Sequence, residues 1–135
     1  MSQRKRLLDT SVLVGYWRLS VRSQQLTNYA EVDAIRWANQ LVEIHETRAI
    51  VTPVFVEFVA GARSGHELRL ARSFLSVFEV IDEARIPSQD WQRATRLAER
   101  VPRNGKRRQL GDCLIRAIAD RLHYEVVTVD GSFPR

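Results

Sequence analysis

Residues 7–14 read LLDTSVLV, an apolar run that is interrupted by Asp9 and two hydroxyl residues and then resumes. Leu7 and Leu8 predict a short buried strand, and the residues after Asp9 predict a turn into a helix. In an open parallel sheet, ligands bind beyond the carboxyl ends of the strands. Because Asp9 closes the first predicted strand, it is the first candidate for a functional site.

Short apolar runs alternate with helical patterns along the rest of the chain. We expect strands at residues 7–8, 49–51, 78–82 and 126–129. We expect helices at residues 32–44, 54–60, 67–77, 87–101 and 111–122. Such alternation requires crossover connections and a parallel sheet. The sequence therefore predicts a three-layer α/β/α fold with a mainly parallel central sheet, formed as one domain over residues 1–135.

Three local features of this pattern are specific enough to test. Thr52 and Pro53 predict a helix start in which Thr52 is the N-cap residue. Pro102 is expected to stop a helix, and the basic segment 103–108 is expected to be a loop. Residues 17–27 are polar and without clear period, which predicts a loop or a broken helix.

Composition indicates a globular protein with a polyanionic partner. The chain has 21 Lys and Arg against 16 Asp and Glu, a net charge of +5, and its only lysines are Lys5 and Lys106. Arginine binds phosphate oxygens through two parallel hydrogen bonds and stacks on bases. Nucleic acid is the most common partner of this kind. Arginines that solvate helix faces or pair with an acidic protein are the alternatives.

Cysteine, histidine and hydropathy restrict the remaining classes. Cys113 is the only cysteine, so no intrachain disulfide forms, and its apolar neighbours predict a packed thiol. The three histidines lie too far apart in the sequence for a Cys/His metal site. No segment reads as a signal peptide or a membrane span. We expect a cytoplasmic protein.

Three further acids join Asp9 as candidates: Glu57, Asp112 and Asp130. Asp130 closes the last predicted strand, although Asp before Gly131 is also typical of a turn. Glu57 has three apolar residues on each side, so it lies either on a narrow exposed stripe or in a buried functional position. Asp112 lies at the rim of the buried face of its helix; the alternative is a helix-start acid that interacts with the dipole and with Arg116.

Convergence of these carboxylates would call for a metal ion. Carboxylates in one cleft repel one another and raise their pKa values. Mg²⁺ or Mn²⁺ prefers such oxygen ligands, activates water and neutralises charge on a phosphodiester. Periodicity alone does not establish that the four acids meet.

Four segments resemble the PIN domain, and within it the VapC-type toxins of toxin–antitoxin modules. They are residues 7–14, VEFVAG at 56–61, GDCLIRAIA at 111–119 and VTVDGSF at 127–133. Each is short, but their order and spacing span nearly the whole chain. The resemblance implies a PIN-like fold and Mg²⁺- or Mn²⁺-dependent hydrolysis of RNA by the toxin of a type II toxin–antitoxin system. It also implies a homodimer and a cognate antitoxin whose C-terminal segment offers a basic group to the acids.

The resemblance also assigns roles to individual residues. Asp9, Glu57, Asp112 and Asp130 take the family's catalytic acidic positions, with Asp9 and Asp112 as the expected direct metal ligands. The hydroxyls of Thr128 and Ser11 match positions that orient the cluster through hydrogen bonds.

Two departures and three alternatives accompany this interpretation. Residues 18–33 look longer than usual for the family, and many relatives continue beyond residues 133–135 into one more strand. The first alternative is another enzyme, a PIN-type RNA-processing or DNA nuclease. The second is a non-catalytic nucleic-acid-binding or partner-binding module. A haloacid-dehalogenase-like phosphatase is set aside, because that family requires a second Asp at the position of Ser11.

Overall fold

A computed structural model describes residues 5–22, 25–100 and 108–134. The strands are β1 (Arg6–Leu8), β2 (Ala49–Ile50), β3 (Glu79–Val80) and β4 (Glu125–Val127). The helices are α1 (Thr10–Val21), η1 (Leu26–Asn28, a 3-10 turn), α2 (Glu31–His45), α3 (Thr52–Ala60), α4 (Gly65–Leu75), α5 (Ser88–Ala98) and α6 (Leu110–Leu122).

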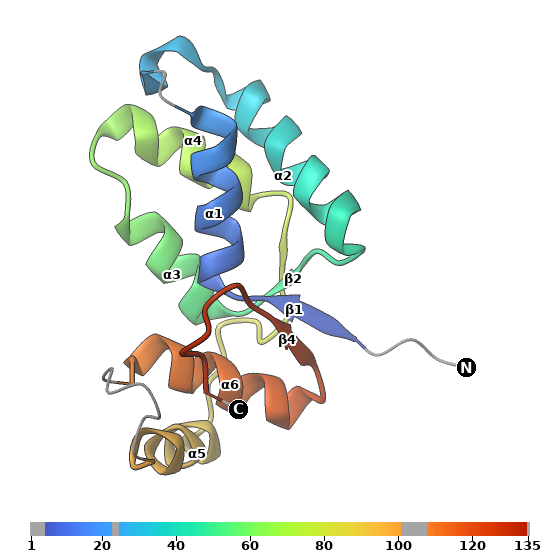
Figure 1. The fold of residues 1–135 in the computed structure, drawn as a ribbon, viewed down its shortest axis with the longest axis vertical. Coiled ribbons are helices and arrows are strands. Elements are labelled where there is room, and N and C mark those ends of the chain that lie inside the picture. The colour runs from blue at the N-terminus through green and yellow to red at the C-terminus, as the bar shows by residue number, and fades with distance from the viewer. Residues whose placement is uncertain (1–4, 23–24, 101–107, 135) are drawn as a thin grey trace.

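The strands form two short parallel ladders at the centre of the molecule. β1 pairs with β4, with Leu8 opposite Val127, and β2 pairs with β3, with Ile50 opposite Val80. Strands β1 and β2 contact each other between the two ladders. Figure 1 shows the strands between helices α1–α4 on one side and α5 and α6 on the other. The predicted α/β fold, with helical layers around a parallel sheet, is confirmed.

Helix α1 extends further than the sequence predicted. Residues 17–21, expected to be irregular, are its last turns, and residues 26–28 form η1. The ring of Trp17 packs edge-to-face against Trp37, Phe58 and Phe74, at centroid distances of 5.5, 5.4 and 5.3 Å. A helix that ends at Val21 and is followed by a separate 3-10 turn agrees with the broken helix and not with the loop. Trp17 is half-buried among partners from three other helices, which favours continuation of α1 to Val21.

The start of α3 also differs from the prediction. Thr52 is the first residue of the helix, and Val51 occupies the cap position. The backbone N–H and the hydroxyl of Thr52 both donate to Asp82 Oδ1, at 2.9 and 3.0 Å. The sequence predicted that the Thr52 side chain would accept a hydrogen bond at the start of the helix. Instead Asp82, just beyond β3, is the acceptor, and Thr52 donates to it. Pro102 and most of the basic segment 103–108 lie outside the described residues.

Helices α5 and α6 pack around a smaller core of their own, which includes the buried Cys113 that the sequence predicted. Two Arg–Asp pairs join these helices. Arg121 Nε donates to both carboxylate oxygens of Asp90 at 2.9 and 3.0 Å, and the Asp90 side chain is only 2% exposed. Arg93 binds Asp120 at 3.2 Å, where both side chains are more than one-third exposed. The two helices are therefore joined by one Arg–Asp pair with a buried carboxylate, Asp90, and by one solvent-exposed pair, Arg93–Asp120.

This contrast yields a stability prediction. Arg121→Ala leaves the buried Asp90 carboxylate unpaired and should lower the free energy of unfolding by about 3 kcal/mol. Arg93→Ala removes an exposed pair and should cost less than about 1 kcal/mol. Urea unfolding of the two variants measures the difference. Equal losses of stability would contradict the role assigned to the buried pair.

Candidate active site

The β1–β4 ladder brings the first and last candidate acids to the same edge of the sheet. The Asp9 N–H donates to the Val127 carbonyl at 3.1 Å, which continues the ladder by one residue. The Asp9 side chain is 1% exposed, and its Oδ1 accepts from the Ser11 hydroxyl at 2.7 Å and from the Val12 N–H at 3.3 Å. Asp9 is thereby the N-cap of α1, so its orientation is set by the start of that helix.

Ser11 and Thr128 connect the start of α1 to the segment after β4. Their hydroxyl oxygens lie 3.3 Å apart. The Val129 N–H donates to Ser11 Oγ at 3.2 Å, and the Asp130 N–H donates to Thr128 Oγ1 at 3.0 Å. Asp130 Oδ1 also accepts from the Ser132 N–H at 2.9 Å. Asp130 is therefore a turn residue, which is one of the two interpretations that the sequence allowed. Its backbone is also hydrogen-bonded to Thr128.

Glu57 reaches this region from α3. Its side chain is exposed, so the buried position that the sequence allowed is wrong. The Thr10 hydroxyl donates to Glu57 Oε1 at 2.7 Å. A Cβ atom placed on Gly111 would lie 2.6 Å from Glu57 Oε2 and 2.9 Å from Oε1. The carboxylate of Glu57 thus lies directly over the backbone of α6 beside Asp112, in space that only glycine leaves open.

Asp112, in the first turn of α6, is influenced by all three other candidate acids. Burial, followed by repulsion from Asp130, Glu57 and Asp9, raises the pKa of Asp112 to about 6 from an ordinary value of 3.8. The other three candidate acids are thus near enough to act electrostatically on Asp112, and we call the four residues the acid cluster.

The alternative for Asp112, an ion pair with Arg116, is not found among the described residues. Arg116 Nε donates to the Pro134 carbonyl at 2.9 Å, and its guanidinium lies 5.5 Å from the centre of the Phe133 ring. Arg116 also pairs with Asp120 at 3.8 Å. Arg116 therefore anchors the C-terminal segment and does not neutralise the acid cluster.

The acid cluster fits a hydrated divalent ion in its chemistry. Its donors are all carboxylates, and burial together with repulsion from the other three acids raises the pKa of Asp112. Within residues 5–22, 25–100 and 108–134, no three Asp, Glu, His or Cys side chains are arranged to hold one metal ion. Mg²⁺ is usually bound through one or two carboxylates and keeps several waters. The described residues therefore offer carboxylate oxygens of the type that Mg²⁺ prefers, but no set of three ligands.

Two residues of the site were missed by reasoning from sequence. Thr10 follows Asp9 directly and was visible as a hydroxyl, but nothing in the sequence shows that it faces Glu57. Gly111 was interpreted only as part of a helix start. Both act on Glu57 from other elements, so their roles depend on the packing of α3 against α1 and α6.

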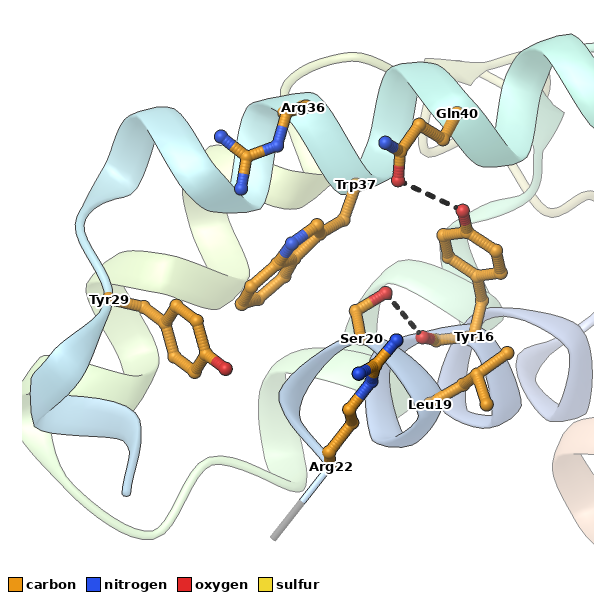
Figure 2. Close-up of a pocket in the computed structure, with 8 residues that line it drawn as sticks. All are labelled: Tyr16, Leu19, Ser20, Arg22, Tyr29, Arg36, Trp37 and Gln40. Carbon is orange, nitrogen blue, oxygen red and sulfur yellow. Dashed lines mark hydrogen bonds between the residues drawn. The ribbon is translucent and has the colours of Figure 1, made fainter. Parts of the chain in front are cut away.

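A separate groove of about 380 Å³ lies between α1 and α2. Figure 2 shows Trp37 and Gln40 of α2 across this groove from Tyr16 and Ser20 of α1, with a hydrogen bond from the Tyr16 hydroxyl to Gln40. No member of the acid cluster lines the groove. It is therefore distinct from the candidate active site.

Comparison with known proteins supports one assignment. The family model for the PIN domain matches residues 6–135. Searches of curated proteins and of solved structures found no match to this chain. No helix of the described residues is long and apolar enough to cross a membrane. With the family model matching almost the whole chain, the protein belongs to the PIN-domain family, whose members are generally metal-dependent nucleases.

Proposed function

We propose that this chain is a metal-dependent endoribonuclease that hydrolyses RNA phosphodiester bonds. The observation that carries the proposal is the acid cluster, assembled at the carboxyl end of the β1–β4 ladder in a PIN-domain chain. The net charge of +5 favours a polyanionic substrate.

In this proposal the residues of the site have separate roles. Asp9 and Asp112 hold Mg²⁺ or Mn²⁺ directly, and Glu57 and Asp130 complete the acidic environment. When bound, the ion supplies an activated water and neutralises charge on the phosphodiester. Ser11 and Thr128 keep Asp9 and Asp130 in place, since Ser11 donates to Asp9 and Thr128 accepts from the Asp130 N–H.

RNA cleavage is the direct test of this proposal. Purified protein should cleave RNA with Mg²⁺ and become inactive in EDTA. Thr128→Val removes a group that only orients the acids and should reduce activity by roughly 10- to 100-fold. Asp9→Asn removes a proposed metal ligand and should reduce activity by more than this. Glu43→Gln, an exposed acid on α2, is the matched control. Equal cleavage by wild type and Asp9→Asn would contradict the role of Asp9, and cleavage of DNA alone would indicate a DNA nuclease.

The biological role that we propose is that of the toxin of a type II toxin–antitoxin system, acting in the cytoplasm as a homodimer. A cognate antitoxin would inhibit it by presenting a basic group to the acid cluster. Expression should arrest growth, and co-expression of the neighbouring gene product should restore it. Normal growth on expression of an active nuclease would favour an RNA-processing role, and normal growth with an inactive protein would favour a binding module.

The space beside Gly111 provides a sharper test of Glu57. Gly111→Ala should displace the Glu57 carboxylate and lower kcat, while the helix keeps its stability or gains up to about 1 kcal/mol from the higher helix propensity of Ala. Gly15→Ala in α1 is the matched control, because nothing lies within 4 Å of a Cβ atom at Gly15. Steady-state cleavage rates and melting temperatures are measured for both variants. Equal kcat values would show that the position of Glu57 does not matter.

The raised pKa of Asp112 predicts a pH-dependent stability in the absence of metal. Because its pKa is about 6 in the folded protein and 3.8 ordinarily, ionised Asp112 destabilises the fold above pH 6, and the penalty disappears as pH falls below about 4. In EDTA, Asp112→Asn should therefore raise the melting temperature at neutral pH and leave it unchanged near pH 4. Mg²⁺ should stabilise the wild type more than the variant. Parallel pH curves for the two proteins would contradict this prediction.

A further inference from the structure

A second pocket adjoins the acid cluster. It has a volume of about 330 Å³ and lies between α1, η1, α3 and the start of α4. Figure 1 shows α1, α3 and α4 on the same side of the strands. Glu57, a member of the acid cluster, also lines this pocket. A ligand chain that reaches the acids therefore has a hollow immediately beside them, of a size typical of small-molecule sites.

The pocket has an apolar surface that includes aromatic rings. Trp17, Leu26 and Phe58 line it, and the rings of Trp17 and Phe58 pack edge-to-face at 5.4 Å. Trp17 and Phe58 are also held by Phe74 in the main core. Phe58 is buried, so the half-buried Trp17 and Leu26 form the part of this surface that a ligand can reach, and single-stranded bases stack on aromatic side chains.

Three arginines, Arg18, Arg22 and Arg63, line the same pocket, and all three side chains are exposed. Within the described part of the chain, none of their guanidinium groups has an ion pair or a hydrogen bond. The other lining carboxylate, Glu67, accepts from the backbone N–H of Arg63 at 3.1 Å.

Elsewhere in the chain, the arginines that join helices are paired, as Arg93 and Arg121 are. The pocket therefore presents unpaired positive charge beside an apolar surface.

We infer that this pocket binds the RNA strand next to the phosphate at the acid cluster, with a base against Trp17 and Leu26 and the flanking phosphates on Arg18, Arg22 and Arg63. The inference rests on the proposed function, since it takes the acid cluster as the cleavage site. Free guanidinium groups match phosphate oxygens in geometry and charge. A peptide would use the apolar surface but would need acidic side chains to engage three arginines. The observations therefore favour RNA over a protein segment.

Salt-dependent RNA binding tests the arginines. A fluorescent single-stranded RNA is titrated with protein in EDTA, where no cleavage interferes, at several salt concentrations. Removal of one arginine–phosphate interaction should reduce the slope of log K against log salt by about 0.7, which weakens binding about fivefold at 0.1 M salt relative to a 1 M reference. Arg18→Ala and Arg63→Ala should each show this change. Arg96→Ala, an exposed arginine on α5 outside the pocket, should leave the slope unchanged.

Filling the pocket tests its shape without changing its charge. Ala62 lines the pocket, and Ala62→Trp should weaken RNA binding and raise KM while kcat stays close to wild type. Ala98→Trp, at an exposed position on α5, is the matched control. In the wild type, RNA that carries 4-thiouridine should crosslink on irradiation to residues 14–26 or 57–71.

The outcomes separate the two proposals. If the wild type cleaves RNA but the arginine and Ala62→Trp variants bind it with wild-type affinity and salt dependence, the pocket inference is overturned and a protein segment becomes the better occupant. If the wild type binds RNA through Arg18 and Arg63 but does not cleave it with Mg²⁺, the nuclease function is overturned and the pocket assignment stands. Crosslinks confined to other residues also overturn the pocket assignment.

Discussion

The parallel pairing of β1 with β4 joins the two ends of the chain, with Leu8 opposite Val127 and the Asp9 N–H donating to the Val127 carbonyl. Because the two strands run in the same direction, the residues that follow them emerge at one edge. Asp9 and Thr128 become neighbours for this reason, and Ser11 then connects to both sides of the ladder. The site therefore forms only when the fold closes, since each half of the chain carries part of it.

The same arrangement concentrates negative charge. Burial and repulsion from three other carboxylates together raise the pKa of Asp112, so its ionised form is disfavoured there. Hydrogen bonds keep the acids there in spite of this: the start of α1 holds Asp9, Thr10 holds Glu57, and the turn at Ser132 holds Asp130. Packing and hydrogen bonds elsewhere offset the repulsion, which is a common property of active sites.

Positive charge is distributed in a complementary way. Arg121 and Arg93 join α5 to α6, and Arg116 secures the C-terminal segment against Phe133. The guanidinium groups of these arginines already have partners within the chain. Arg18, Arg22 and Arg63 line the same pocket as Glu57 without such partners, and the excess of basic residues gains a candidate role there.

The sequence by itself determined the features that depend on short-range pattern. Alternating strands and helices, the burial of Cys113 and the candidate acids were all predictable, because hydrophobic period and the chemistry of a side chain are local properties. Only the tertiary structure decided the length of α1, because the ring of Trp17 packs against rings on three other helices. It also decided the start of α3, where Thr52 donates a hydrogen bond to Asp82. It also decided that Glu57 lies over Gly111 and under the hydroxyl of Thr10, which is 47 residues away in the chain. Contacts between residues so far apart depend on how whole elements pack, and no local pattern in the sequence encodes them.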